Sequence, residues 1–301
     1  MKATVISFIN MKGGVGKTTL TINVGKKLSD LGHKVLIVDM DPQFNATQSL
    51  LLYKTQYSCG NLEDDNEEHI FEQEMKSSEF YKLLSDRKET VLQMFESSCI
   101  TEEPTSTIKQ IVKNLYLIPG DLRLLKEVSG DNTNKFSTVT KYFKKNNILD
   151  EFEYILIDCS PTWSILTHSS LFASDYYVIP SKIDLYSSIG INLLEEQINK
   201  KIREEEYVSK EKEIRRLGII FTLVNRNIRT EEKIRNNLKN DFSDIEFFEN
   251  DFPYIPSAST RFIMIDEVKH NSIYSELVNS VEKITEELKT KLQEMEVNSS
   301  V

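Results

Sequence analysis

The sequence predicts an α/β protein with a doubly wound, mostly parallel sheet flanked by helices. Short apolar, β-branched runs alternate with segments that repeat apolar residues at helical spacing, which is the pattern of consecutive βαβ units. The run KVLIVDM at 34–40 is almost continuously apolar, as expected for a parallel strand covered on both faces. Polar motifs follow several of these runs, and ligands of such sheets bind at the carboxyl ends of the strands.

The first βαβ unit is complete by residue 40. A strand is expected within ATVISFIN at 3–10, and a helix from Thr18 to Leu31 that ends at Gly32, before the strand at 34–40. Helix-like stretches separate four further expected strands, at Leu115–Pro119, Tyr154–Cys159, Tyr176–Pro180 and Leu217–Asn225.

Residues 1–301 are expected to form one domain, because the chain has no internal repeat and no Pro-rich linker. From about 53 to 113 the alternation breaks into polar and acidic segments with helix-like pieces at 67–84 and 88–97, which predicts a helical insertion on the sheet. Its acidic run EDDNEE is interpreted as a solvated loop, with a partner-binding surface as the alternative.

A C-terminal helix is predicted at about 273–296. Apolar residues recur there at steps of three or four. They are Leu277, Val281, Ile284, Leu288, Leu292 and Met295. The polar face carries more Glu than Lys, whereas a membrane-surface helix has a basic polar face. We therefore expect this helix to pack against the domain or a partner helix, and we expect no membrane binding.

Composition narrows the possible functions. Hydrophobic residues make up 39% of the chain and charged residues 28%, as in ordinary globular proteins. No apolar run is long enough to span a bilayer and no secretory signal opens the sequence, so we expect a cytoplasmic protein.

The three cysteines are widely spaced, so we expect them to be reduced thiols. A net charge of −10 means that any contact with DNA phosphates must be local.

A phosphate-binding loop, KGGVGKTT at 12–19, lies between the first strand and the first helix. Its glycines, Gly13, Gly14 and Gly16, permit a backbone conformation in which successive N–H groups point toward a phosphate. The N–H group of Val15 is one of them. The positive end of the dipole of the following helix also attracts the phosphate. Lys17 can reach the β- and γ-phosphates. Thr18 can ligate Mg²⁺, and Thr19 lies near the α-phosphate. The generic motif has glycine at position 11, whereas this chain has Met11 followed by Lys12.

Two further motifs end predicted strands in carboxylates. In VDMDPQ at 38–43, Asp39 and Asp41 point the same way from an extended chain because they are two residues apart. In YILIDCSP at 154–161, Asp158 has the position of a Walker B carboxylate, which holds the water shell of Mg²⁺.

Four stretches together resemble the ParA/MinD family of deviant Walker A ATPases, a branch of the P-loop NTPases. They are Lys12 with GGVGKTT, VDMDPQ, LIDCSP and residues 171–194. The resemblance spans residues 3 to about 268 in the family's order. No helix-turn-helix extension precedes the first strand, so the chain is similar to the short, Soj-like ParA type.

The resemblance implies roles for these positions. ATP and Mg²⁺ would be the cofactors of a dimer that closes around them, with slow hydrolysis until a partner stimulates it. Lys12 would cross the interface to the partner's phosphates, and Asp41 would orient the attacking water. Asp39 and Asp158 would support Mg²⁺ together with Thr18. A helix N-cap is the alternative role for Asp41.

For the base, the resemblance points to Asn225, after the strand GIIFTLVN, and to Pro253 in FPYIPSASTRF at 252–262, which resembles a loop that closes over adenine. A plain turn residue is the alternative for Asn225. Arg226, Arg229 and Lys233 are candidate DNA contacts, because they share a face if a helix begins soon after Asn225. A solvated helix face is the alternative for them.

The function implied is a partition ATPase. An ATP-dependent homodimer would bind nonspecific DNA on the bacterial nucleoid and segregate plasmid or chromosome DNA with a ParB-like centromere-binding partner. The alternative is an ATP switch that positions a protein cargo without binding DNA, with the insertion at about 53–113 as its adaptor surface.

Overall fold

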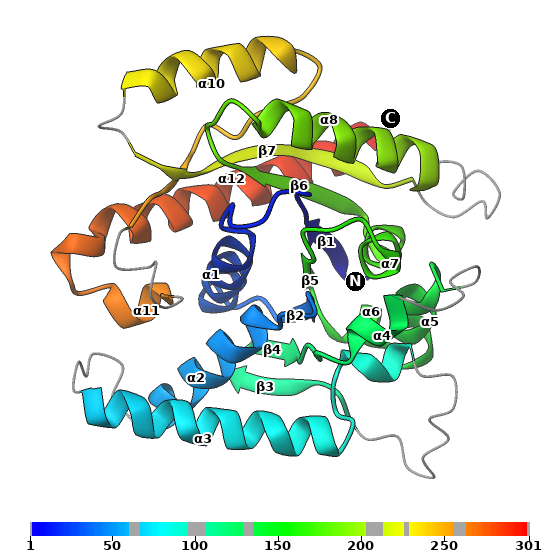
Figure 1. Ribbon diagram of the computed structural model, residues 1–301, viewed down its shortest axis with the longest axis vertical. Coiled ribbons are helices and arrows are strands. Elements are labelled where there is room, and N and C mark those ends of the chain that lie inside the picture. The colour runs from blue at the N-terminus through cyan, green and yellow to red at the C-terminus, as the bar shows by residue number, and fades with distance from the viewer. Residues whose placement is uncertain are drawn as a thin grey trace.

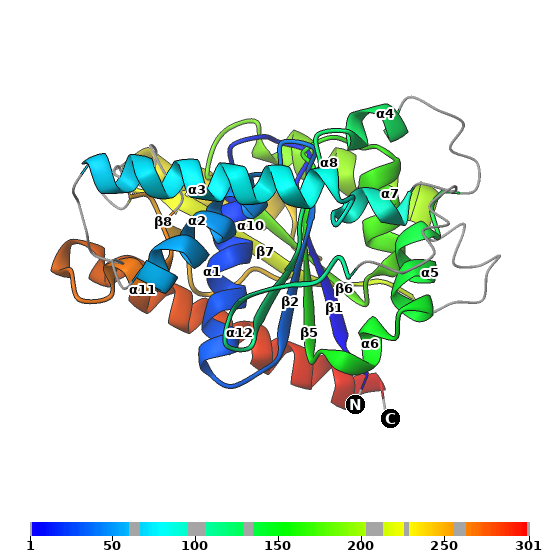
Figure 2. The same cartoon turned by 90° about the horizontal axis from the view of Figure 1, so that it is seen from below.

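An eight-stranded sheet forms the centre of the molecule, and helices cover both of its faces (Figures 1 and 2). The computed structural model describes residues 2–59, 67–95, 106–128, 135–202, 213–225, 229–255 and 263–299. The strand order is β3-β4-β2-β5-β1-β6-β7-β8. Only β3 runs antiparallel, to its neighbour β4, among the strands of the described chain. The predicted fold class is confirmed.

The elements have the following bounds. The strands are β1 (Thr4–Phe8), β2 (Val35–Met40), β3 (Lys109–Val112), β4 (Leu115–Ile118), β5 (Tyr154–Cys159), β6 (Tyr176–Ser181), β7 (Arg215–Val224) and β8 (Phe252–Pro253). The α-helices are α1 (Lys17–Asp30), α2 (Asn45–Cys59), α3 (Glu67–Asp86), α4 (Leu124–Val128), α5 (Thr138–Lys145), α6 (Ile148–Glu151), α7 (Ile165–Ala173), α8 (Ser187–Gln197), α10 (Arg229–Asp241), α11 (Ile265–Val268) and α12 (Ser275–Ser299). Short irregular helices are η1 (Val91–Met94), η2 (Ile198–Ile202) and η4 (Ser272–Tyr274).

Each face of the sheet has its own hydrophobic core, which explains the continuously apolar strands. In β2, Val35 and Ile37 pack in the core beneath α1, α2 and α12, whereas Leu36 and Val38 pack in the core beneath α5 and α7. Successive side chains of a strand point to opposite faces, so both sets must be apolar. The sheet is thereby held rigidly between two helical layers, and its carboxyl edge is a fixed platform.

Two strands and one helix differ from the sequence-based expectations. The short strands β3 and β8 were not predicted. β3 pairs with β4 at one edge of the sheet, and β8 pairs with the end of β7 at the other. The helix-like piece expected at 88–97 forms only the 3₁₀ turn η1 within its described part, and residues 96 and 97 lie outside the described residues. Short edge strands carry too few alternating residues to give a pattern.

Helix α3 lies along α2 on the carboxyl side of the sheet (Figure 2). The ring of Phe44 stacks on Tyr81 at a centroid distance of 4.6 Å, and Lys54 Nζ lies 5.4 Å from the ring centroid of Phe80. The first four positions of the acidic run EDDNEE, 63–66, lie outside the described residues, and its last two, 67 and 68, belong to α3.

Helix α12 buries Leu277, Val281, Ile284 and Leu288 against α1 and the sheet. In the described segments, no helix combines the length and the low polarity that crossing a bilayer requires.

Candidate nucleotide-binding site

The loop between β1 and α1 emerges at the carboxyl edge of the sheet, in the middle of the face that Figure 1 shows. Gly14 and Gly16 have φ values of 66° and 78°, in the left-handed region that side chains disfavour. α1 begins directly after Gly16, at Lys17, so the unpaired N–H groups of its first turn lie at the loop. This geometry is suited to binding an anion.

Two neighbouring strands fix the loop from outside. The Thr222 hydroxyl of β7 donates to the backbone oxygen of Val15 at 2.6 Å. The amide of Asn10 donates to the backbone oxygen of Pro180 at 2.8 Å, and its oxygen accepts from Lys12 N at 2.9 Å. Thr222 and Asn10 could not be predicted, because no local pattern distinguishes them from other polar residues at strand ends.

Asp39 and Asp158 lie opposite each other on the adjacent strands β2 and β5, and both are fully buried. The Thr18 hydroxyl donates to Asp158 Oδ2 at 2.7 Å. Asp158 Oδ1 is buried and has no hydrogen-bond partner among the described residues. Burial of a carboxylate oxygen without a hydrogen-bond partner raises the free energy of the folded protein. Coordination of a cation by this oxygen would remove that penalty.

Asp39 is held by the first turn of α2. Asp39 Oδ2 accepts from the backbone N of Thr47 at 2.8 Å and from its hydroxyl at 2.7 Å. The Thr47 hydroxyl in turn accepts from Gly120 N at 2.7 Å. A Cβ at position 120 would lie 3.0 Å from Asp39 Cγ, so only glycine fits there without displacement. Thr47 and Gly120 could not be predicted, because Thr47 lies outside the motif of Asp39 and Gly120 lies far from it along the chain.

The two buried carboxyl groups favour their protonated forms in the absence of a cation. Burial, and after it the charge of Asp158, raise the pKa of Asp39 to about 8. Burial raises the pKa of Asp158 to about 7, against the lowering effects of the Lys17 ammonium and the Thr18 hydroxyl. A divalent cation would replace these protons, because it stabilises both charges at once.

The residues present fit Mg²⁺ bound with few protein ligands. Mg²⁺ usually keeps several waters and takes one or two carboxylates together with phosphate oxygens. Thr18, Asp39 and Asp158 supply this kind of oxygen set beside the loop. The described residues contain no group of three or more His, Cys, Asp or Glu that could hold a metal. The remaining ligands would therefore be water and phosphate. Bound there, Mg²⁺ would neutralise phosphate charge.

Asp41 lies two residues beyond Asp39 and is 8% exposed. Its Oδ1 accepts from the backbone N of Gln43 at 3.0 Å, in a turn that precedes α2. α2 begins at Asn45, so Asp41 is not its N-cap, and the alternative role considered from sequence does not hold. The carboxylate is therefore placed at the carboxyl edge of the sheet by a turn.

Lys12 pairs with a carboxylate other than the two buried ones. Its ammonium forms an ion pair with Asp184, in the turn between β6 and α8. Burial would raise the pKa of Asp184, but the hydrogen bond from Lys12 and that from the backbone N of Tyr186 lower it below its ordinary value. The two cations of the loop are thus separated: Lys17 faces the carboxylates and Lys12 faces α8.

The two residues expected at the base, Asn225 and Pro253, end the adjacent strands β7 and β8. Asn225 is half-buried, and its backbone N donates to Glu231 Oε2 at 3.1 Å. Pro253 is buried and pairs with Val224. The two positions are therefore close neighbours at one end of the sheet, while 256–262, the rest of the expected loop over the base, lies outside the described residues.

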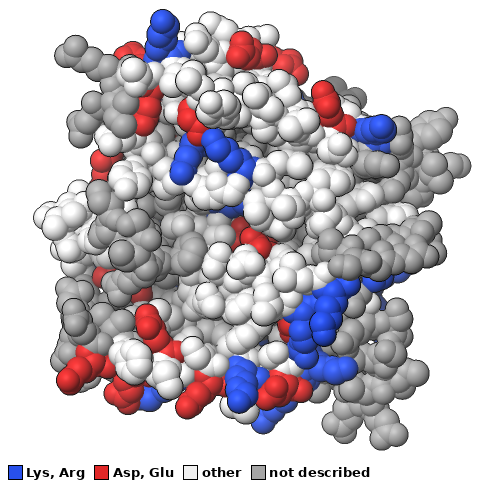
Figure 3. Space-filling model, viewed as in Figure 1, with Lys and Arg blue, Asp and Glu red and all other residues white. Residues whose placement is uncertain are grey.

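The candidate DNA contacts are only partly described. Arg226 lies outside the described residues, and Arg229 begins α10 without a described side chain. Lys233 is exposed on α10. Arg235 is neutralised by Asp251, with N–O distances of 2.9 and 2.6 Å. Figure 3 shows lysine and arginine side chains gathered on the loop-bearing face, near α4 and the carboxyl end of α3, where Arg87, Lys88 and Lys126 are exposed.

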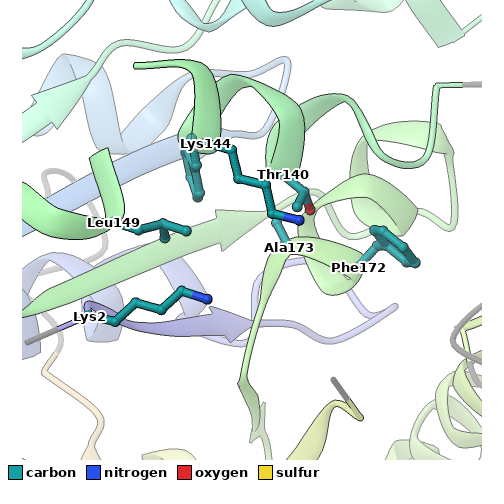
Figure 4. A pocket seen from close by; sticks show the side chains of 7 residues that line it. Lys2, Thr140, Lys144, Leu149, Phe172 and Ala173 are labelled. Atoms are coloured by element: carbon teal, nitrogen blue, oxygen red, sulfur yellow. The ribbon is translucent and has the colours of Figure 1, made fainter. Parts of the chain in front are cut away.

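A cavity of about 230 Å³ lies at the opposite, amino edge of the sheet (Figure 4). Lys2, Thr140, Lys144, Leu149 and Phe172 line it, together with Phe143 and Ala173. None of the motif residues contributes to it, so it is separate from the loop.

The fold and this site define a P-loop NTPase. A family model described as an AAA domain matches residues 3–212. The chain belongs to this family, in its ParA/MinD type. The resemblance that its motifs indicate is confirmed.

Known relatives agree with this assignment. The chain is 30% identical to the sporulation initiation inhibitor protein Soj of Bacillus subtilis over 194 residues, which cover 63% of the chain and 62% of Soj. It is 24% identical to the chromosome partitioning protein ParA of Caulobacter vibrioides over 246 residues, 80% of the chain and 77% of that protein. In Soj and in two further curated relatives, the chain spans about half to three fifths of the relative's own length.

A solved structure shows the same fold over nearly the whole chain. A plasmid partition protein from Borrelia burgdorferi, bound to AMPPNP, superposes with a TM-score of 0.68 at 21% identity. The superposition covers 97% of the chain and 100% of that protein.

The paired carboxylates make the stability of the nucleotide-free protein pH-dependent. Asp39 and Asp158 have raised pKa values in the folded state, so folding takes up protons between about pH 4 and pH 8. This contribution to stability is fully present below the unfolded pKa near 4 and is lost as pH rises through 7 and 8. We expect Tm in EDTA to fall between pH 6 and 8.5, and Asp158→Asn to reduce the fall by about 1 kcal/mol or a few °C.

The control is Asp150→Asn, which removes an exposed carboxylate in α6. Calorimetric melting curves at four or five pH values measure the effect. A pH profile of Asp158→Asn that coincides with those of the wild type and Asp150→Asn would contradict the raised pKa values.

Proposed function

We propose that the protein is a partition ATPase that binds Mg²⁺·ATP, forms an ATP-dependent dimer and binds duplex DNA without sequence preference. Hydrolysis is slow until a ParB-like partner stimulates it. The observation that carries the proposal is the assembly of Lys17, Thr18 and two buried carboxylates at one glycine-rich loop. Family membership and the partition roles named for its relatives support the same function.

Within this function, each group of the site has one task. The loop N–H groups and Lys17 bind the β- and γ-phosphates, and the buried carboxylates orient the water shell of Mg²⁺. Asp41 orients the water that attacks the γ-phosphate. Asn225 and Pro253 flank the base. Their location at the ends of two adjacent strands supports this assignment.

A second candidate is an ATP switch for a protein cargo. Three large apolar side chains of α3 favour it: Phe71, Met75 and Leu83 are 63%, 50% and 50% exposed. Such residues in one helix are typical of a surface that a partner covers.

Binding to random duplex DNA separates the two functions. For the partition ATPase we expect ATP-dependent binding that weakens steeply with salt, because association releases counterions from the phosphate backbone. Lys233→Ala should reduce the slope of log K against log salt by about one if Lys233 contacts a phosphate. Fluorescence anisotropy with AMPPNP between 50 and 300 mM salt measures both.

The matched control is Lys283→Ala, which removes a lysine from the far helix α12 and should leave the slope unchanged. Absence of DNA binding at low salt, in a protein that binds ATP, would overturn the DNA function and favour the cargo switch. Normal DNA binding by Lys233→Ala with an unchanged slope would show that Lys233 does not contact a phosphate. The exposed Arg87 and Lys126 would then be the next residues to replace.

A further inference from the structure

The cavity at the amino edge of the sheet has an apolar wall. Phe143 of α5 and Phe172 of α7 are buried there, and Leu149 of α6 lines the cavity with them. We call these three side chains the cavity wall. The cavity volume of about 230 Å³ exceeds the roughly 150 Å³ of an apolar cavity that binds one benzene molecule. The space is therefore large enough for a ring or a short alkyl chain that carries one small polar group.

Two lysines from distant parts of the chain supply positive charge to the cavity. Lys2 precedes β1 and Lys144 lies in the last turn of α5, and their side chains extend toward each other in Figure 4. The backbone next to Lys2 is fixed, because Ala3 N donates to the backbone oxygen of Leu149 at 2.7 Å. None of the described residues that line the cavity is acidic. The cavity therefore attracts an anion.

The hydroxyl of Thr140 is a third polar group of the cavity. Thr140 Oγ1 is buried and has no hydrogen-bond partner in the part of the chain that the structure describes. In other helices, the hydroxyls of Thr21, Thr55 and Thr285 donate to the backbone oxygen four residues earlier, which is a common bond of helical threonines. A buried hydroxyl without a partner raises the free energy of the folded protein. An acceptor oxygen bound in the cavity would remove this penalty.

We propose that this cavity binds a small organic monocarboxylate, in which the carboxylate is attached to one ring or to a short alkyl chain. The carboxylate accepts hydrogen bonds from the two lysines and from Thr140, and the apolar part packs against the cavity wall. An inorganic anion leaves the cavity wall in contact with water, and a neutral hydrocarbon leaves the two ammonium groups and the hydroxyl without an acceptor. Only a ligand with both parts satisfies the whole cavity. The site is independent of the phosphate loop, which lies at the opposite edge of the sheet.

The affinity of such a ligand is limited by its size and by the exposure of the two lysines. For about ten non-hydrogen atoms we expect a dissociation constant on the order of 0.1–1 mM. Benzoate and hexanoate are the probes, because both carry one carboxylate on an apolar part that fits the cavity volume. A ligand-observed NMR titration of the full chain measures the dissociation constant.

Three variants locate the bound carboxylate. We expect Lys2→Gln together with Lys144→Gln to weaken benzoate binding about tenfold, since each exposed ion pair contributes little. Thr140→Val keeps the shape of the side chain without its hydroxyl and should weaken binding roughly threefold or more. The matched control is Lys141→Gln, which removes an exposed lysine of α5 that does not line the cavity and should leave the affinity unchanged. Circular dichroism verifies that each variant folds.

Two further ligands test the chemical class. Benzyl alcohol, which keeps the ring and lacks the charge, should bind at least tenfold more weakly than benzoate, and inorganic phosphate should not displace benzoate. No saturable binding of benzoate or hexanoate by the wild type up to about 20 mM would overturn the proposal. Equal affinities of the double lysine variant and Lys141→Gln would also overturn it, because binding would then lie outside this cavity. Equal binding of benzyl alcohol, or displacement by phosphate, would refute a site for monocarboxylates.

Discussion

Lys17→Ala is expected to reduce the affinity for Mg²⁺·ATP by about 100-fold or more, because a 6% exposed cation is lost from the centre of the site. Lys17 is the only charged side chain of the described site that lowers the pKa of Asp158, so its removal also leaves the two buried carboxylates without a neighbouring positive charge. Both changes weaken binding of an anion. Titration calorimetry measures the affinity.

Lys27→Ala is the matched control, since Lys27 lies in the last turn of the same helix and pairs with Glu282 at 2.6 Å, far from the loop. Circular dichroism verifies that both variants fold. ATP affinity of Lys17→Ala equal to that of the control would refute the assignment of the phosphate site.

Asp41→Ala is expected to reduce ATP turnover by roughly 10²- to 10⁴-fold, the range for loss of a group that activates the attacking nucleophile. Asp41 is 8% exposed, and within the described chain its carboxylate accepts a hydrogen bond from the backbone of its own turn, so its replacement should leave nucleotide binding intact. A stable ATP-dependent dimer with little turnover is the expected state. Phosphate release under single-turnover conditions, with size-exclusion chromatography in ATP, measures both properties.

Asp150→Ala, which removes an exposed carboxylate in α6, is the control for turnover. Full turnover by Asp41→Ala would exclude Asp41 as the group that orients water. A variant that stays monomeric in saturating ATP would instead contradict the proposed ATP-dependent dimer.

Much of the fold could be predicted because its central strands are apolar on both faces. β2 and β5 lie where their runs predict them, and Asp39 and Asp158 then follow from the parallel register of neighbouring strands. The phosphate loop could also be predicted from a short stretch of sequence, since glycines and the start of α1 specify it within six residues. Patterns of this kind require no knowledge of distant contacts.

The supporting groups could not be predicted, because each acts across the fold. Thr47 reaches Asp39 from the next helix, Thr222 reaches Val15 from 207 residues away, and Asp184 reaches Lys12 from 172 residues away. Each is a common polar residue in an ordinary local context. Only the packing of β6, β7 and α2 around the loop brings these residues to it.

The central claim is that the glycine loop, Lys17 and the buried carboxylates together bind a triphosphate with Mg²⁺. Calorimetric titration of the wild-type protein with ATP, in Mg²⁺ and in EDTA, tests it most directly. We expect saturable heat close to one nucleotide per protomer, with tighter binding in Mg²⁺. No heat from either ATP or GTP in Mg²⁺ would contradict the claim.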